Sequence, residues 1–165
     1  MKLLVSDANI FIDMETGGLT RSMFELPETF IVPDILFIEE LAEQHAELPA
    51  YGLQIRSLTS ESVQYSIQLR QHYTQTSSND LHALSLARQE QCPLLTGDDH
   101  LRKAAKSEGI EFHGTIWLVD RMLKDKIIKI ADAVIAYDAM KQNARRLPWN
   151  EVNKQLEVYK LKLKK

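Results

Sequence analysis

The sequence predicts a three-layer α/β/α fold, in which a central, mainly parallel sheet is followed by a helical C-terminal extension. Three observations predict it. Short apolar runs alternate with stretches of helical periodicity as far as His113. The connections between these runs are long enough for the crossover helices that parallel strands need. Beyond Gly114 no run has the composition of a strand.

The first strand and helix are marked by a sharp change of polarity. Residues 2–6 contain a short apolar run that stops at Asp7, which predicts a buried strand followed by a turn into a helix. Gly17 and Gly18 end that helix, because glycine is a poor helix former and tolerates the turn that follows.

The second strand is predicted at residues 30–32, and Pro33 stops it. Asp34 can begin the next helix, which we expect to continue to about residue 47. Four apolar residues of that helix have the spacing of one buried face: Ile35, Ile38, Leu41 and Ala42.

The middle of the chain continues the alternation. Residues 53–57 alternate as a short edge strand does, residues 61–72 have helical spacing, and the polar residues 74–79 form a loop. Residues 80–89 are rich in Ala and Leu, so they predict a helix, and Ser78 or Asn79 can cap it.

The remaining elements complete the sheet and start the extension. We expect a strand at residues 92–96, a helix at 98–107 and a last strand at 110–113. Helical patterns follow near residues 117–123, 130–143 and 149–163. These patterns predict one domain over residues 1–123 and a helical extension over 124–165, packed on that domain or projecting from it.

Composition excludes several classes of protein. No apolar run approaches the roughly 18 residues that cross a bilayer, so we expect a cytoplasmic protein without a membrane segment. The single cysteine, Cys92, excludes an internal disulfide. Residues 121–165 hold 12 Lys and Arg against 5 Asp and Glu, whereas residues 1–120 hold 8 against 18. This asymmetry fits an acidic centre beside a basic nucleic-acid surface, or a solvated basic helix.

Three aspartates occupy equivalent positions in the predicted fold. Asp7 and Asp98 directly follow strands, and Asp80 opens a helix. The carboxyl ends of parallel strands meet at one edge of a sheet, so these side chains can converge there, together with Glu39 or Glu40. Each aspartate alone is explained as a helix cap, but capping does not require a shared edge.

Converging carboxylates restrict the chemistry. Two unit charges about 4 Å apart repel by about 4 kcal/mol at an effective dielectric constant near 20. Some carboxyl groups must therefore be protonated, or a divalent cation must neutralise them. A ligand set that consists only of oxygen atoms favours Mg2+ or Mn2+. Such ions held by carboxylates are suited to the hydrolysis of a phosphodiester. None of the histidines has metal-ligand spacing, and each is expected on the surface or in the core: His45, His72, His82, His100 and His113.

The motifs around these acids resemble the PIN-domain family, which includes the VapC-like toxin ribonucleases of bacterial toxin and antitoxin pairs. The run SDANIFID, which starts at Ser6, is similar to the family's opening signature, with Asp7 at the end of the strand and Asn9 beside the site. The run NDLHALSLAR is similar to the helix that carries the third acid, here Asp80. The run LLTGDDHLRKAA is similar to the turn that carries the fourth acid, here Asp98.

The second acid of the family lies on the helix after the second strand, and VPDILFIEELAEQ matches that position loosely. Glu40 precedes an aliphatic residue, whereas counting from Pro33 favours Glu39, so both stay candidates. Asp99 lies where the family is variable, and we expect it only to add charge at a helix start. The resemblance covers roughly residues 2–119.

The resemblance implies a PIN-like fold and an endoribonuclease, a hydrolase that needs Mg2+ or Mn2+. It implies that Asp7, Asp98 and Glu39 or Glu40 hold the metal, while Asp80 binds a second metal or orients a water. The implied partners are RNA, an antitoxin protein and a second copy in a homodimer.

Supporting roles are expected for four further residues. Asn9 and Thr96 would orient the acids through hydrogen bonds. Arg102 and Lys103 are candidates for phosphate contacts, although a solvated helix face explains them equally well.

Two other readings stay open. One is a non-catalytic, degenerate PIN-like module that binds RNA or a partner without cleaving. In the other, the basic helices from Lys124 onward act mainly by docking RNA or a partner helix.

Overall fold

The sheet consists of five parallel strands in the order β3-β2-β1-β4-β5 in the computed structural model, which describes residues 2–164. The strands are β1 (Leu3–Ser6), β2 (Thr29–Pro33), β3 (Gln54–Arg56), β4 (Leu94–Leu95) and β5 (Phe112–His113). The central strand is β1, where Val5 pairs with Ile31 of β2 on one side and with Leu94 of β4 on the other. The predicted α/β class with a parallel sheet is confirmed.

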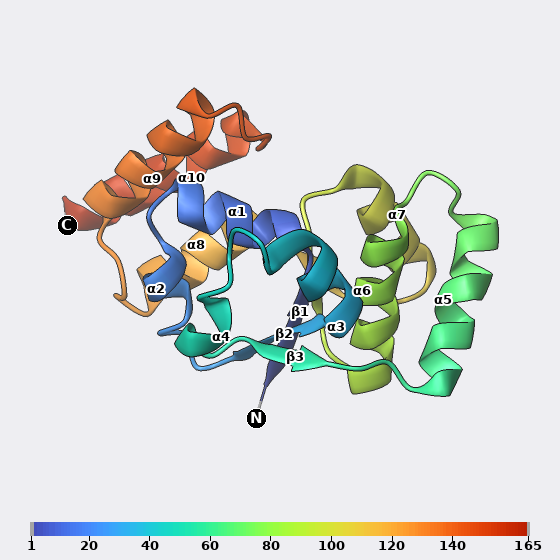
Figure 1. Ribbon diagram of the computed structural model, residues 1–165. Coiled ribbons are helices and arrows are strands. Elements are labelled where there is room, and N and C mark those ends of the chain that lie inside the picture. Colours follow the sequence, from blue (N-terminus) through green and yellow to red (C-terminus); the bar gives the residue numbers. More distant parts are fainter. Residues whose placement is uncertain (1, 165) are drawn as a thin grey trace.

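Helices cover both faces of the sheet (Figure 1). One face is covered by α6, which contacts β1, β2 and β4, with α5 packed against its outer side. The opposite face carries α1, α2 and α8 (Figure 1). The bounds of these helices are α1 (Ala8–Thr16), α2 (Thr20–Met23), α5 (Ser60–His72), α6 (Ser78–Glu90), α7 (Asp99–Ser107) and α8 (Thr115–Lys124).

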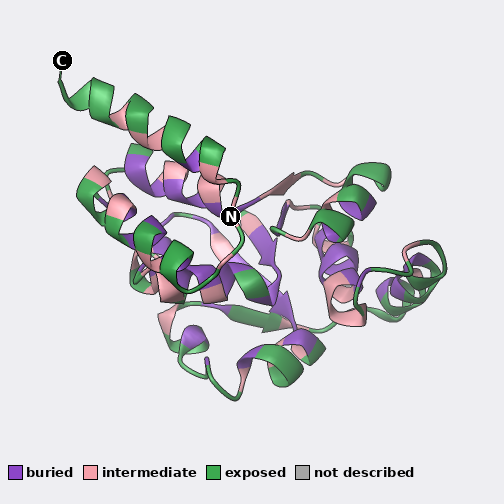
Figure 2. Cartoon of the chain, turned by 90° about the horizontal axis from the view of Figure 1, so that it is seen from above, coloured by how far each residue is buried: buried purple, intermediate pink, exposed green. Residues whose placement is uncertain are grey.

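The strands and α6 form the centre of the core. Val5, Ile31 and Leu94 are each fully buried, as expected where a parallel sheet is covered on both faces. In Figure 2 the burial follows the sheet and the inner helices, while the outer helices are exposed along one side. The carboxyl ends of the strands are thus held in place by a packed core.

The last two helices share this core. Helix α9 (Ile130–Gln142) packs on α1, and α10 (Trp149–Leu163) packs on α9 and α8. A Cβ atom added at Gly17 would lie 2.8 Å from Cε of Met140 and 3.0 Å from Cβ of Ala136, so α9 comes very close to the end of α1. Tyr137 and Val152 are also buried. Removal of residues after Leu123 would therefore expose apolar faces of α1 and α8.

The helix after β2 differs from the prediction. It begins at Asp34 as α3 (Asp34–Leu36), but continues as a π-helical turn, η1 (Phe37–Leu41), and ends there instead of near residue 47. The backbone N–H of Ala42 donates to the carbonyl oxygen of Phe37, five residues earlier, at 2.7 Å.

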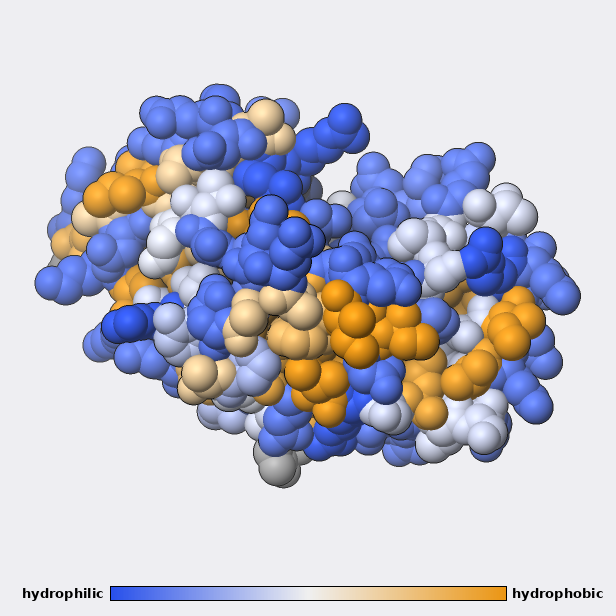
Figure 3. Space-filling view, viewed as in Figure 1, coloured by the Kyte–Doolittle hydropathy of each residue, from blue (hydrophilic) through white to orange (hydrophobic). Residues whose placement is uncertain are grey.

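This wider turn changes which side chains are buried. Leu36 and Leu41, five residues apart, face the core, whereas Ile35 and Ile38 are 43% and 69% exposed. The predicted buried face was wrong at both isoleucines, because it assumed the spacing of a regular α-helix. Hydrophobic surface gathers around α3 in Figure 3.

Smaller differences concern the ends of elements. The strands β4 and β5 have two residues each, and α6 is capped by Ser77, whose Oγ accepts from the N–H of Asp80 at 3.2 Å, not by Ser78 or Asn79. The short helices α2 and α4 (Leu48–Tyr51) were not predicted. Within residues 2–164, no helix combines the length and the apolar composition needed to cross a membrane.

Candidate active site

Asp7 lies where β1 passes into α1. Its backbone is extended, with φ −77° and ψ 171°, and it caps the helix through Oδ1, which accepts from the N–H of Ile10 at 3.0 Å. Oδ2 accepts from the hydroxyl of Thr96 at 2.6 Å. The residue is fully buried. Both carboxylate oxygens are therefore fixed in direction, one by a donor from the first turn of α1 and the other by a donor that follows β4.

Asp98 lies at the end of the neighbouring strand, β4, and caps α7. Its Oδ1 accepts from the N–H of Leu101 at 2.8 Å. Its own N–H donates to Oγ1 of Thr96 at 3.0 Å, and this is the same hydroxyl that donates to Asp7. Thr96 thus links the two aspartates across the β1–β4 pair. The backbone N–H of Asp7 also donates to the carbonyl oxygen of Leu95 at 3.0 Å.

Asp80 lies in the first turn of α6 and is partly buried. Burial, followed by the charges of Asp98 and Glu40, raises its pKa to about 6. Burial also raises the pKa of Asp7 to about 7, with smaller contributions from the charges of Asp80 and Asp13, although the hydrogen bonds from Thr96 and Ile10 oppose the rise. The charges of Asp98 and Glu40 therefore act on Asp80, and the charge of Asp80 acts on Asp7.

The two candidate glutamates face different neighbours, although both are exposed on η1. The charge of Glu40 acts on Asp80. Oε2 of Glu39 accepts instead from Nδ2 of Asn79 at 3.2 Å. Burial lowers the pKa of His82, and the charge of Glu39 acts in the opposite direction on that pKa. Of the two glutamates, Glu40 is therefore the one whose charge acts on an aspartate of the site, Asp80.

The donor set suits a hard divalent cation, because carboxylate oxygens are the ligands that Mg2+ and Mn2+ prefer. The raised pKa values of Asp7 and Asp80 fit this reading, since a cation removes the cost of gathering negative charge. The carboxylates are not tightly clustered. In residues 2–164, only Glu15, His45 and Glu47 bring three ligand atoms within 4.8 Å of one another. A wider arrangement is compatible with Mg2+, which keeps several of its waters.

A second polar group adjoins the aspartates, and the sequence did not predict it. Asp13 is buried one helical turn beyond Asn9, on the same side of α1. Its Oδ2 accepts from the hydroxyl of Thr115 at 2.8 Å, and its Oδ1 accepts from Nε of Arg145 at 2.6 Å. Arg145 also donates to the side-chain oxygen of Asn9 at 3.2 Å. The only sequence signal was an aspartate between Ile12 and Met14 in an apolar helix.

The loop between α9 and α10 thus reaches the carboxyl edge of the sheet through Arg145. Together with α10 it borders a groove of about 1310 Å³, whose other wall includes Asn9 and Asp98. The space-filling view is hollowed between the C-terminal helices and α7, with hydrophilic surface around the hollow (Figure 3). Arg146 and Lys154 also line this groove and are exposed.

The two predicted phosphate-binding residues differ in their surroundings. Arg102 is partly buried, its Nε donates to the carbonyl oxygen of Thr96 at 2.9 Å, and its Cζ lies 5.5 Å from the centre of the Phe112 ring. Lys103 is exposed on α7. Arg102 therefore supports the backbone beside Asp98, and it also lines the groove.

Fold and site together define a class: an α/β domain with carboxylates gathered where the strands of a parallel sheet end. A family model of the PIN domain matches residues 3–160, so the chain belongs to the PIN-domain family. No curated protein matches the sequence.

Two solved structures are similar to this chain. One is a PilT N-terminus domain protein from the hyperthermophilic archaeon Sulfolobus solfataricus P2, with 13% identity and a TM-score of 0.50 over 74% of this chain and 94% of that one. The other is VapBC2 from Rickettsia felis bound to a DNA fragment from their promoter, with 16% identity and a TM-score of 0.49 over 68% of this chain and 98% of that one. At 13% identity, the similarity to the PilT N-terminus domain protein concerns the fold alone.

Proposed function

We propose that the protein is an endoribonuclease dependent on Mg2+ or Mn2+, with Asp7, Glu40, Asp80 and Asp98 as its acidic centre. One observation carries the proposal: at the carboxyl edge of the sheet, burial and then the charges of Asp98 and Glu40 raise the pKa of Asp80, and the charge of Asp80 adds to the effect of burial on the pKa of Asp7. The capping roles of Asp7 and Asp98 would not require this. Membership of the PIN-domain family supports the same conclusion.

The bound cation would polarise the phosphate and activate the attacking water. The protein would orient the reactants. The hydrogen bonds from Thr96 and Ile10 hold Asp7 in one direction, so its carboxylate does not have to reorganise as a ligand. Asp80, on which the charges of Asp98 and Glu40 act, would bind a second cation or orient the attacking water.

The groove beside the acids would hold the RNA strand. Arg146 and Lys154 are exposed along it and can meet phosphates without losing an internal partner. The ring of Trp117 is stacked on that of His113 with centroids 4.1 Å apart, and both line the groove. Bases stack on aromatic faces when they are unpaired, so we expect a preference for single-stranded RNA.

Cleavage of a single-stranded RNA with Mn2+, with Mg2+ and with chelator tests the proposal. We expect cleavage by the parent with either cation, and near-complete loss in Asp98→Asn. Asp99→Asn is the matched control, because Asp99 is the exposed neighbour in the first turn of α7. Equal activity in both variants would remove Asp98 from the centre. A folded parent that binds RNA but does not cut it would favour the non-catalytic module.

The finer role is that of a toxin restrained by an antitoxin protein, which the family resemblance implies. Expression of the parent in a bacterial host should then arrest growth, whereas Asp98→Asn should not. If the host grows normally while it produces the parent protein in soluble form, the toxin role is contradicted, but RNA cleavage is not.

A further inference from the structure

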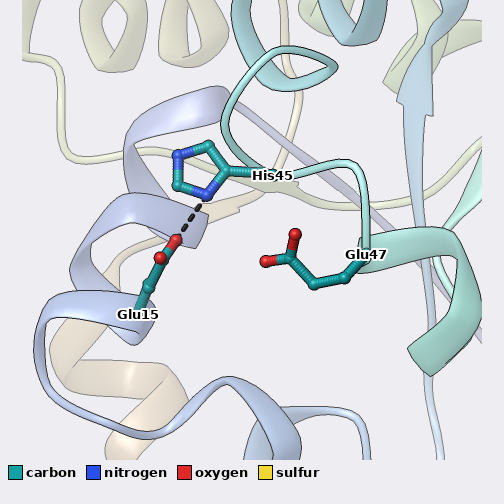
Figure 4. Close-up of side chains that lie close together, drawn as sticks. All are labelled: Glu15, His45 and Glu47. Carbon is teal, nitrogen blue, oxygen red and sulfur yellow. Dashed lines mark ion pairs between the residues drawn. The ribbon is translucent and has the colours of Figure 1, made fainter.

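A different group of metal-ligating side chains lies at the far end of α1 from Asp7. Glu15 is in the last turns of α1, and His45 and Glu47 lie in the segment between η1 and α4. One ligand atom from each residue lies within 4.8 Å of the other two. In Figure 4 the carboxylates of Glu15 and Glu47 both extend toward the His45 ring.

The histidine distinguishes this group from an ordinary surface cluster of acids. His45 is 8% exposed, and its Nδ1 is buried without a hydrogen bond of normal geometry. The same nitrogen faces Oε2 of Glu15 as an ion pair (Figure 4). A buried ring nitrogen that lacks a well-formed hydrogen bond is costly, and a cation between the ring and the carboxylates would satisfy it.

The backbone holds His45 in this position before any ion binds. Its N–H donates to the carbonyl oxygen of Leu41 at 2.7 Å, and its carbonyl oxygen accepts from the N–H of Leu48 at 3.2 Å. Glu15 is held by its helix, and Glu47 directly precedes α4. Both carboxylates are exposed, so they can move the short distance that coordination requires.

We propose that Glu15, His45 and Glu47 form a binding site for a transition-metal dication of the Zn2+ type. One imidazole nitrogen and two carboxylates are a ligand set typical of zinc, with water in the fourth position. Tetrahedral ligands about 2.0 Å from zinc lie about 3.3 Å apart, so coordination would move the Glu15 carboxylate away from Nδ1 of His45, an adjustment that an exposed side chain can make. Mg2+ is disfavoured, because it prefers oxygen ligands alone.

Such an ion would tie two elements of the candidate active site together. Glu15 lies on the helix that Asp7 caps, and His45 follows the π-helical turn that carries Glu40. The ion would fix α1 relative to that turn and would not touch the reacting groups. The site is independent of the proposed nuclease activity.

Zn2+ binding to the metal-free protein, measured by isothermal titration, tests the site. All variants are made in the Asp98→Asn background, which weakens competing binding at the acidic centre. We expect one equivalent of Zn2+ to bind this background protein and to raise its melting temperature. His45→Gln and Glu47→Gln should each lose this binding by at least tenfold in Kd. Glu43→Gln is the matched control, an exposed acid on the same segment, and should bind as the background does.

Circular dichroism without metal separates loss of binding from loss of folding, and Glu47→Gln covers the case in which the buried histidine is needed to fold. The proposal is overturned if the background protein binds no Zn2+ at micromolar concentration. It is also overturned if folded His45→Gln and Glu47→Gln both bind Zn2+ as tightly as Glu43→Gln does.

Discussion

Replacing Asp7 with asparagine should stabilise the protein at neutral pH while it abolishes RNA cleavage. Burial raises the pKa of Asp7 from 3.8 to about 7. This rise corresponds to about 4 kcal/mol of free energy that the ionised carboxylate costs the fold at high pH. Asparagine has no charge to bury, but it fits the hydroxyl of Thr96 less well. We therefore expect a gain in unfolding free energy of roughly 2–4 kcal/mol.

The sign of this effect depends on pH. A raised pKa means that the folded protein binds the proton more tightly than the unfolded chain does. The stability associated with that proton is complete below about pH 4 and is lost as the pH rises through about 7. The advantage of Asp7→Asn should therefore be absent near pH 4, grow through the neutral range and level off above about pH 8.

Urea denaturation followed by circular dichroism, in chelator and at several pH values, measures this difference. Asp99→Asn is the control, because it removes an exposed charge close to the same edge of the sheet. The reasoning is refuted if Asp7→Asn is less stable than the parent at about pH 8, or if the difference between them does not change with pH.

Three further substitutions have distinct expected outcomes. Thr96→Val removes the hydroxyl that donates to the buried carboxylate of Asp7. The affinity for Mn2+, measured by titration, should therefore fall roughly 10- to 100-fold, and an unchanged affinity would contradict this role. Glu40→Gln should lower RNA cleavage by roughly tenfold or more, whereas Glu39→Gln should not, and the reverse result would exchange the two. Arg145→Gln should lower the unfolding free energy by about 3 kcal/mol, because it leaves the buried carboxylate of Asp13 without its ion pair. The control Arg146→Gln, at an exposed position, should change the unfolding free energy little. Equal urea midpoints for the two variants would exclude this contribution.

The positions of the three aspartates could be predicted because they depend on local signals. For Asp7 and Asp98 the signal is a strand that ends in a sharp change from apolar to polar residues, because parallel strands bring such ends to one edge; for Asp80 it is the start of the helix rich in Ala and Leu. That reasoning needs only the order of elements and the alternation of polarity. The last two helices, predicted at residues 130–143 and 149–163, lie at Ile130–Gln142 and Trp149–Leu163.

The choice between Glu39 and Glu40 could not be made from sequence, because it depends on the π-helical turn. One extra residue in a helical turn rotates the side chains that follow about the helix axis, and no residue in this segment predicts such a turn. The exposed Ile35 and Ile38 have the same cause. Helical periodicity assumes a regular helix and fails where the backbone departs from one.

Contacts between distant segments were equally out of reach. The pairing of Asp13 with Arg145 joins residues on α1 and on the loop before α10. His45 was expected to have no ligand role, because its spacing to other histidines carries no signal. Its acidic neighbours include Glu15, which comes from α1, a distant part of the sequence. Such pairs depend on how helices dock, which spacing along the chain does not encode.

Release of protons on binding of Mn2+ tests the central claim most directly. At about pH 6.5 Asp7 is mostly protonated and Asp80 partly protonated in the ion-free protein, and a cation must displace these protons. Titration calorimetry in two buffers of different ionisation enthalpy measures the number released. We predict release of close to one proton at this pH, falling toward zero above about pH 8. The double variant that carries both Asp7→Asn and Asp80→Asn should release no proton. Tight binding of Mn2+ without any proton release at the lower pH would contradict the account.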